Sequence, residues 1–126
     1  MSGGKVLAWY MGNGSNYVYT GAEGITSTTT VSDNAWHNVV FTVDIVGGKL
    51  YVDGKLEASR VWTGTPQAST TTNGLGLSYP DGGSFTAYLA ASIDDTRIYN
   101  RALSAAEVGQ LYRLTTPTSV DTGLKG

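Results

Sequence analysis

The chain has no cysteine, few charged residues and no long apolar run, and each absence excludes a class of protein. Without cysteine, its 126 residues cannot form disulfide bonds or thiolate metal sites, so the fold depends on burial and strand pairing. Only 14 % of residues are charged, the net charge is −2, and the eight basic residues are scattered. This charge pattern argues against nucleic acid or an anionic membrane surface as a partner. No segment is apolar for long enough to span a bilayer, so no membrane span is expected.

The length suits one domain with a single core. We expect this domain at residues 1–114, followed by a linker at 115–126. The first residues, Met1-Ser2-Gly3-Gly4, precede strand-like sequence and carry no signal-peptide pattern. The polar residues are mostly Thr, Ser, Asn and Gly, a composition that suits an extracellular or cell-surface module.

Residues 36–59 carry the clearest strand pattern in the chain. Apolar and polar side chains alternate from Val39 to Val43, which is typical of a half-buried strand. The segment Val46–Lys49 predicts a turn, after which the alternation resumes at Leu50–Val52. Asp53-Gly54 predicts a tight hairpin turn, because both residues tolerate positive φ. Three consecutive antiparallel strands are therefore expected to form the centre of a sheet.

The rest of the chain predicts further short strands and one helix. Strands are expected at residues 5–11, 16–20, 25–31, 56–62, 75–79 and 85–93. The apolar Ile98 falls on the opposite parity to Ile93, which predicts a β-bulge or bend at Asp94-Asp95. Eight strands with Gly and Asn turns indicate an all-β, antiparallel β-sandwich (a jelly roll) with one short C-terminal helix.

The start of that helix is well marked. Ser104 and Glu107 have the spacing of a capping box, and Leu103 and Val108 that of a hydrophobic staple. Val108 shares one helical face with Leu111 and Tyr112. We expect this face, with Ile93 and Ile98, to seal one rim of the sandwich, and Trp36, Phe41 and Tyr99 to belong to the core.

Two stretches of the sequence together resemble a known family. They are WHNVVFTVD…GGKLYVDGKLEAS, from Trp36 to Ser59, and IDDTRIYNRALSAAEVGQLY, from Ile93 to Tyr112. Both resemble the laminin G-like, concanavalin A-like jelly-roll domains of bacterial surface proteins. The resemblance covers about residues 5–114 and implies a lectin-like sandwich that binds carbohydrate or a surface protein. The family's usual N-terminal strands are not found here, so either the strands present form a reduced sandwich or two chains pair their edges. We expect the second arrangement, a homodimer or larger assembly.

The candidate ligand site lies on the polar loops. Aromatic faces stack on a pyranose while Asn and Asp bond its hydroxyls, which favours a glycan site made by Trp62, Asn73, Tyr79 and Asp81. The alternative is that Trp62 and Tyr79 only cover the edge of the core. Three other aromatic residues, on the first two strands, are rival candidates: Trp9, Tyr17 and Tyr19.

The acidic pair Asp94-Asp95 has two interpretations. The resemblance implies that Asp94 is a Ca²⁺ ligand, but calcium needs six to eight oxygens and the family's other ligands come largely from the strands not found here. The structural alternative is that Asp94 caps the bend while Asp95 pairs with Arg97 or Arg101. No other cofactor is expected.

No catalytic residues are predicted. Related glycoside hydrolases hold two carboxylates across the scissile bond, whereas the ten acidic residues here are dispersed. The single His37 has no cysteine, second histidine or suitably spaced serine as a partner. The sequence therefore predicts a non-catalytic carbohydrate-binding module of a larger protein. The alternative is a structural or adhesion module that contacts protein or self-associates.

Overall fold

The structure is a computed structural model that describes residues 3–9, 24–61, 77–78 and 87–115. Its elements are β1 (Lys5–Trp9), β2 (Gly24–Thr30), β3 (Val39–Val43), β4 (Gly47–Val52), β5 (Lys55–Val61), β6 (Leu77–Ser78), β7 (Ala87–Tyr88) and α1 (Ala105–Thr115). All strand pairs in these ranges are antiparallel, so the predicted fold class is confirmed. The chain divides into two compact units, residues 1–66 with 101–126, and residues 67–100.

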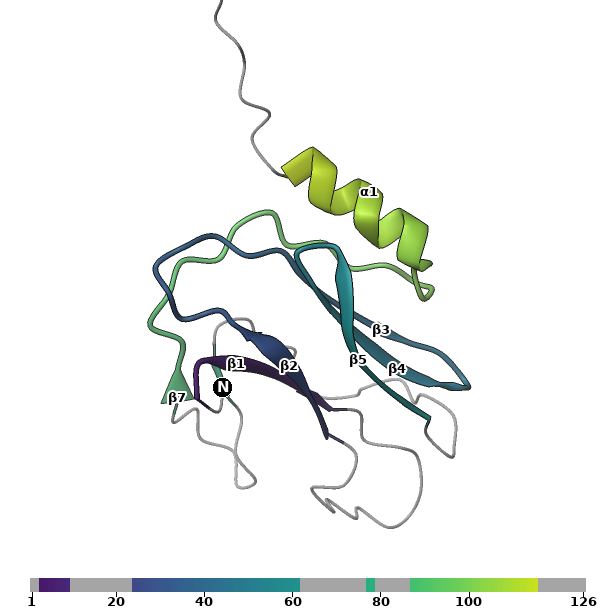
Figure 1. Ribbon diagram of the computed structural model, residues 1–126, viewed down its shortest axis with the longest axis horizontal. Coiled ribbons are helices and arrows are strands. Elements are labelled where there is room, and N and C mark those ends of the chain that lie inside the picture. The colour runs from purple at the N-terminus through teal and green to yellow at the C-terminus, as the bar shows by residue number, and fades with distance from the viewer. Residues whose placement is uncertain (1–2, 10–23, 62–76, 79–86, 116–126) are drawn as a thin grey trace, which may run out of the picture. The chain divides into compact units, whose positions relative to one another are not determined.

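The first unit is built on a sheet of three consecutive strands, β3, β4 and β5 (Figure 1). The β4–β5 turn is the predicted one, with positive φ at Asp53 (51°) and Gly54 (75°). The predicted β3–β4 turn at Val46–Lys49 is wrong, because Gly47 and Gly48 belong to β4. Asp44 makes the turn instead, since its Oδ1 accepts hydrogen bonds from the amides of Val46 (2.7 Å) and Gly47 (3.0 Å). A Cβ on Gly47 would lie 2.0 Å from the Arg60 carbonyl oxygen, so strand contact, not turning, requires this glycine.

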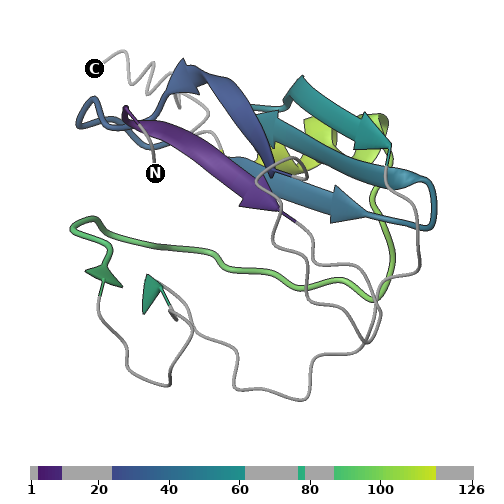
Figure 2. The ribbon, with the colours of Figure 1, turned by 90° about the horizontal axis from the view of Figure 1, so that it is seen from below.

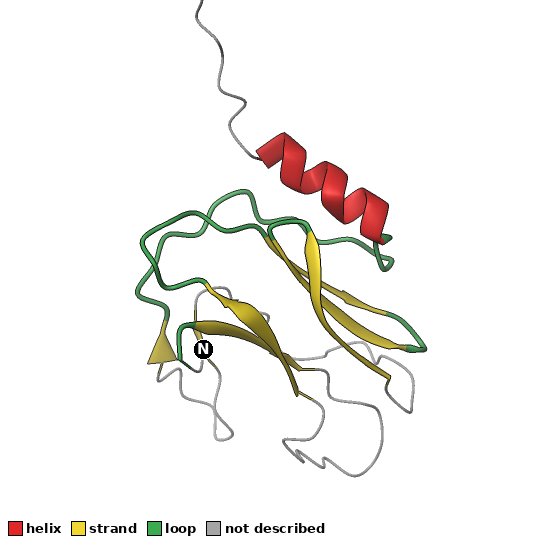
Figure 3. Cartoon of the chain, viewed as in Figure 1, coloured by secondary structure: helices red, strands yellow, loops and turns green. Residues whose placement is uncertain are grey.

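The central strand β4 is covered on both faces. Leu50, Tyr51 and Val52 are all buried, although alternation points Tyr51 to one face and the other two to the opposite face. Tyr51 packs against Val108 of α1 and against Leu103, which lies just before the helix. Figures 1 and 2 show α1 on one side of the three-stranded sheet and the β1–β2 pair on the other, and Figure 3 shows the same order by element type.

The helix begins as the sequence predicts. The Ser104 amide donates to Glu107 Oε2 (2.8 Å), and the Glu107 amide donates to Ser104 Oγ (3.3 Å), which completes the capping box. The staple residues Leu103 and Val108 belong to one buried cluster with Tyr51. No helix among the described residues has the length and apolarity that crossing a membrane requires.

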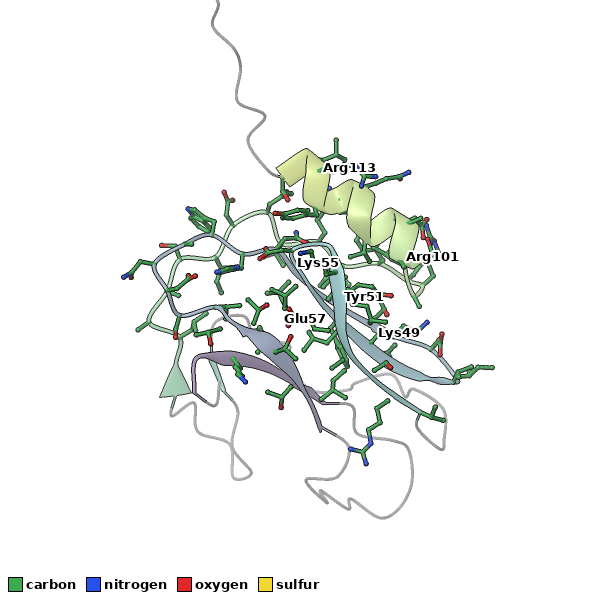
Figure 4. The ribbon with its side chains drawn as sticks, viewed as in Figure 1. Lys49, Tyr51, Lys55, Glu57, Arg101 and Arg113 are labelled. Carbon is green, nitrogen blue, oxygen red and sulfur yellow. The ribbon has the colours of Figure 1, made fainter. Side chains whose placement is uncertain are left out.

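The β2 and β5 strands are linked by a side chain. The register between β4 and β5 shifts between Leu56 and Ala58, which leaves Glu57 as a bulged residue without a partner on β4. Glu57 Oε2 accepts hydrogen bonds from the amides of Thr28 (2.9 Å) and Thr29 (3.0 Å), and Oε1 accepts one from the Thr29 hydroxyl. Glu57 lies between β5 and β2 in Figure 4. One carboxylate therefore takes the place of backbone pairing between these strands.

The same stretch of β2 is irregular toward β1. Lys5 pairs with Thr30 but Leu7 with Thr26, so Val6 faces three residues of β2. The Val6 amide donates instead to the buried Ser27 hydroxyl (2.9 Å). Because of this bulge, the amides of Thr28 and Thr29 can donate to Glu57, while the Ser27 hydroxyl accepts the hydrogen bond of the Val6 amide in β1.

The second unit differs most from the prediction. Within the strand expected at residues 85–93, the described residues form β7 at Ala87–Tyr88, and Leu89–Ile93 has no pairing strand in the described parts of the chain. The predicted bend is found, with Asp95 at φ 51°. Ile93 and Tyr99 are exposed and Ile98 is almost fully so, and their predicted burial is therefore wrong. The expected strand at residues 16–20 lies outside the described residues.

Candidate functional site

The loop before β3 meets the β4–β5 turn at a histidine held by two carboxylates. His37 Nδ1 lies 2.8 Å from Asp53 Oδ2, and His37 Nε2 lies 3.0 Å from Asp33 Oδ1. The side chain of His37 is 13 % exposed, against 29 % for Asp53 and 47 % for Asp33. Both imidazole nitrogens are therefore engaged, and the ring ties the loop to the turn.

The two acids shift the ionisation of the imidazole. The hydrogen bond to Asp53, and then that to Asp33, raise the pKa of His37 above its ordinary value of 6.5 against the opposing effect of burial. In return, the hydrogen bond from His37 lowers the pKa of Asp33. Both acids therefore favour the protonated form of His37.

The backbone around this histidine is fixed as well. The Ala35 amide donates to Asp33 Oδ1 (3.0 Å), and the Asn38 amide donates to Asp53 Oδ1 (3.0 Å). The Asp53 amide donates to the Asn38 carbonyl oxygen (2.8 Å). Gly54, the other turn residue, packs so closely on α1 that a Cβ there would lie 3.0 Å from Tyr112 Cβ. The loop is therefore anchored, through the turn, to the helix.

Trp36 lies in solvent at the centre of this anchored loop. It is 71 % exposed, so its predicted place in the core is wrong. The reason is its neighbour: the two acids hold His37 inward, and Trp36 is left pointing away. The i, i+4 spacing of Asp33 and His37, beside the loop residues Ser32-Asp33-Asn34, is the sequence signal that was missed.

The glycan site predicted from the sequence stays a prediction. Trp62, Asn73, Tyr79 and Asp81 all lie outside the described residues. The same holds for Tyr17 and Tyr19, and for the side chain of Trp9. The loop of Trp36 is an exposed aromatic and polar surface within the described residues.

At Asp94 the structure shows local bonding. Asp94 Oδ1 accepts a hydrogen bond from the Asp95 amide (2.7 Å), and Asp95 holds Arg97 through two hydrogen bonds (3.1 and 2.8 Å). Arg101 pairs with Glu107 through its guanidinium (2.6 Å). No three His, Cys, Asp or Glu side chains group to hold an ion within residues 3–9, 24–61, 77–78 and 87–115. The hydrogen bonds of Asp94 and Asp95 match the structural interpretation, and calcium binding at Asp94 stays a prediction.

Comparison with known proteins gives one family and one solved structure. Residues 1–109 match the family described as the concanavalin A-like lectin/glucanases superfamily, in its laminin G model. The chain is similar to the crystal structure of residues 221–444 of an S-layer domain-containing protein from Clostridium thermocellum ATCC 27405, at 30 % identity and a TM-score of 0.59. That similarity covers 71 % of this chain but only 44 % of the other. Among curated proteins, no match was found.

Proposed function

The chain belongs to the concanavalin A-like lectin/glucanase superfamily, and from that premise we propose that it is a non-catalytic, carbohydrate-binding module of a larger surface protein. The observation that carries the proposal is the match to a lectin superfamily over residues 1–109, nearly the whole chain. The similarity to an S-layer domain-containing protein supports a place at the cell surface. The low charge of the chain suits an uncharged ligand.

The acidic residues support a non-catalytic role. A glycoside hydrolase needs two carboxylates that flank the scissile bond and are free to act on it. Each of the seven acidic residues in the described ranges accepts hydrogen bonds from nearby backbone or side chains: Asp33, Asp44, Asp53, Glu57, Asp94, Asp95 and Glu107. The Arg101 guanidinium and the Ser104 amide, for example, lower the pKa of Glu107 to about 2. Carboxylates engaged in this way are suited to holding the fold together.

Affinity gel electrophoresis tests the proposal directly. The purified chain is run through native gels that contain soluble xylan, β-glucan or galactomannan, beside gels without polysaccharide. We expect at least one neutral polysaccharide to retard the chain without being degraded. Absence of retardation in all of them would contradict carbohydrate binding, and release of reducing sugar would contradict the non-catalytic role.

A second candidate function is a structural or adhesion module that self-associates. It is favoured by the similarity to an S-layer domain-containing protein and by exposed apolar side chains on the first unit, among them Leu56, Val61 and Leu114. A homodimer or larger assembly would cover such side chains. Light scattering on a size-exclusion column tests this: a monomer at micromolar concentration would exclude stable self-association.

A further inference from the structure

Trp36 is exposed without being loosely held. The backbone on both sides of it is fixed by hydrogen bonds. The amides of Ala35 and Asn38 donate to Asp33 and Asp53, and the His37 imidazole is hydrogen-bonded to both acids. An exposed indole on an untethered loop would lose conformational freedom when a ligand bound, which weakens affinity. Here the fold has already supplied that order, and a ligand meets a preorganised aromatic surface.

Two polar residues lie just before Trp36 in the sequence. Asp33 and Asn34 precede it by three and two residues, and both are exposed. Asp33 Oδ1 is hydrogen-bonded within the loop, yet 47 % of the side chain is exposed and accessible to a ligand. Asn34 has a positive φ of 65°, so the backbone turns at this residue just before Trp36. Carboxylate and amide groups bind sugar hydroxyls, and here one of each lies within three residues of an exposed indole in the sequence.

We propose that Trp36, with Asp33 and Asn34, forms a binding subsite for a neutral pyranose, the indole stacking on the apolar face of the sugar while the two polar side chains bind its hydroxyls. This inference rests on the proposed carbohydrate-binding function and assigns it to the loop before β3. Charge selects the class of sugar. Asp33 and Asp53 flank one histidine, so the subsite is negative or close to neutral and disfavours uronic and sialic acids.

The proposal is tested by three variants in the same affinity gels. Trp36→Ala removes the indole, and Trp36→Phe retains a smaller aromatic face. Ile45→Ala is the matched control, because Ile45 is 72 % exposed, like Trp36, but lies in the β3–β4 turn at the other end of the strands. We expect Trp36→Ala to weaken binding at least tenfold, Trp36→Phe to weaken it less, and Ile45→Ala to bind like the wild type.

Two further measurements keep folding and binding apart. Because Trp36 is exposed, the melting temperature of Trp36→Ala should match the wild type within about 2 °C. Addition of the bound polysaccharide should shift the tryptophan fluorescence of the wild type but not that of Trp36→Phe. The anionic polygalacturonate should not retard any variant.

The outcomes separate this inference from the function on which it rests. If the wild type and Trp36→Ala are retarded equally, the subsite is refuted while carbohydrate binding stands. If no polysaccharide retards the wild type, both are refuted. If polygalacturonate binds as well as the neutral polymers, the assignment to a neutral sugar is wrong.

Discussion

Replacement of Glu57 by alanine is expected to destabilise the first unit by about 3 kcal/mol. This carboxylate accepts the Thr28 amide, the Thr29 amide and the Thr29 hydroxyl, and so provides the link between β5 and β2. Hydrogen bonds to a charged group contribute about 1.5–3 kcal/mol each. The bond from Thr28 is exposed, and water can replace it after mutation, so we take a value well below the full sum.

Thermal unfolding followed by circular dichroism measures the effect. For a domain of this size, a loss of about 3 kcal/mol corresponds to a decrease of roughly 12 °C in melting temperature. Thr26→Ala is the control, since Thr26 is an exposed threonine of the same strand. It should change the free energy of unfolding by less than about 0.5 kcal/mol. The Thr29→Ala and Glu57→Ala double-mutant cycle should show a coupling of about 1 kcal/mol.

The pH dependence provides an independent check. Burial raises the pKa of Glu57, but the bonds from Thr29 and Thr28 outweigh it, and the net pKa is lowered from 4.5. A lowered folded-state pKa means that the stabilisation is complete above pH 4.5 and is lost as the pH falls toward the folded value. The difference between wild type and Glu57→Gln should therefore shrink below that pH. If Glu57→Ala unfolds like Thr26→Ala, or the difference does not depend on pH, the carboxylate does not join the strands.

Three further predictions concern other parts of the fold. The pKa of His37 is raised in the folded state, so the stabilisation of the fold by this residue should be complete below about pH 6.5 and be lost as the pH rises through the folded-state pKa. Melting temperatures should show this decline in the wild type but not in His37→Ala. Gly54→Ala should destabilise the fold by about 2 kcal/mol, because Gly54 has φ 75° and lies against Tyr112. Gly109→Ala, in the helix, should instead stabilise the fold by up to about 1 kcal/mol. Urea unfolding in which both variants changed the free energy of unfolding in the same direction would contradict this. Addition of about 1 mM CaCl₂ should leave the melting temperature unchanged, and an increase that Asp94→Asn abolishes would instead show that Asp94 is a calcium ligand.

The features that the sequence determined by itself are those set by neighbours in the chain. The capping box of Ser104 and Glu107 and the turn at Asp53-Gly54 need only a few consecutive residues, and both are found where the pattern predicts them. The three central strands are found where alternation of apolar and polar residues predicts strands.

Tertiary structure decided the rest, because contacts between distant segments outweigh local preference. Gly47 and Gly48 resemble a turn, yet the close approach of Arg60 draws them into β4. Glu57 resembles an ordinary strand residue, yet a bulge directs it to β2. Asp33 lies near His37 in the chain, but the second carboxylate that holds the imidazole inward comes from Asp53, sixteen residues after His37, and only the tertiary structure brings it there. The aromatic surface proposed here exists for that reason.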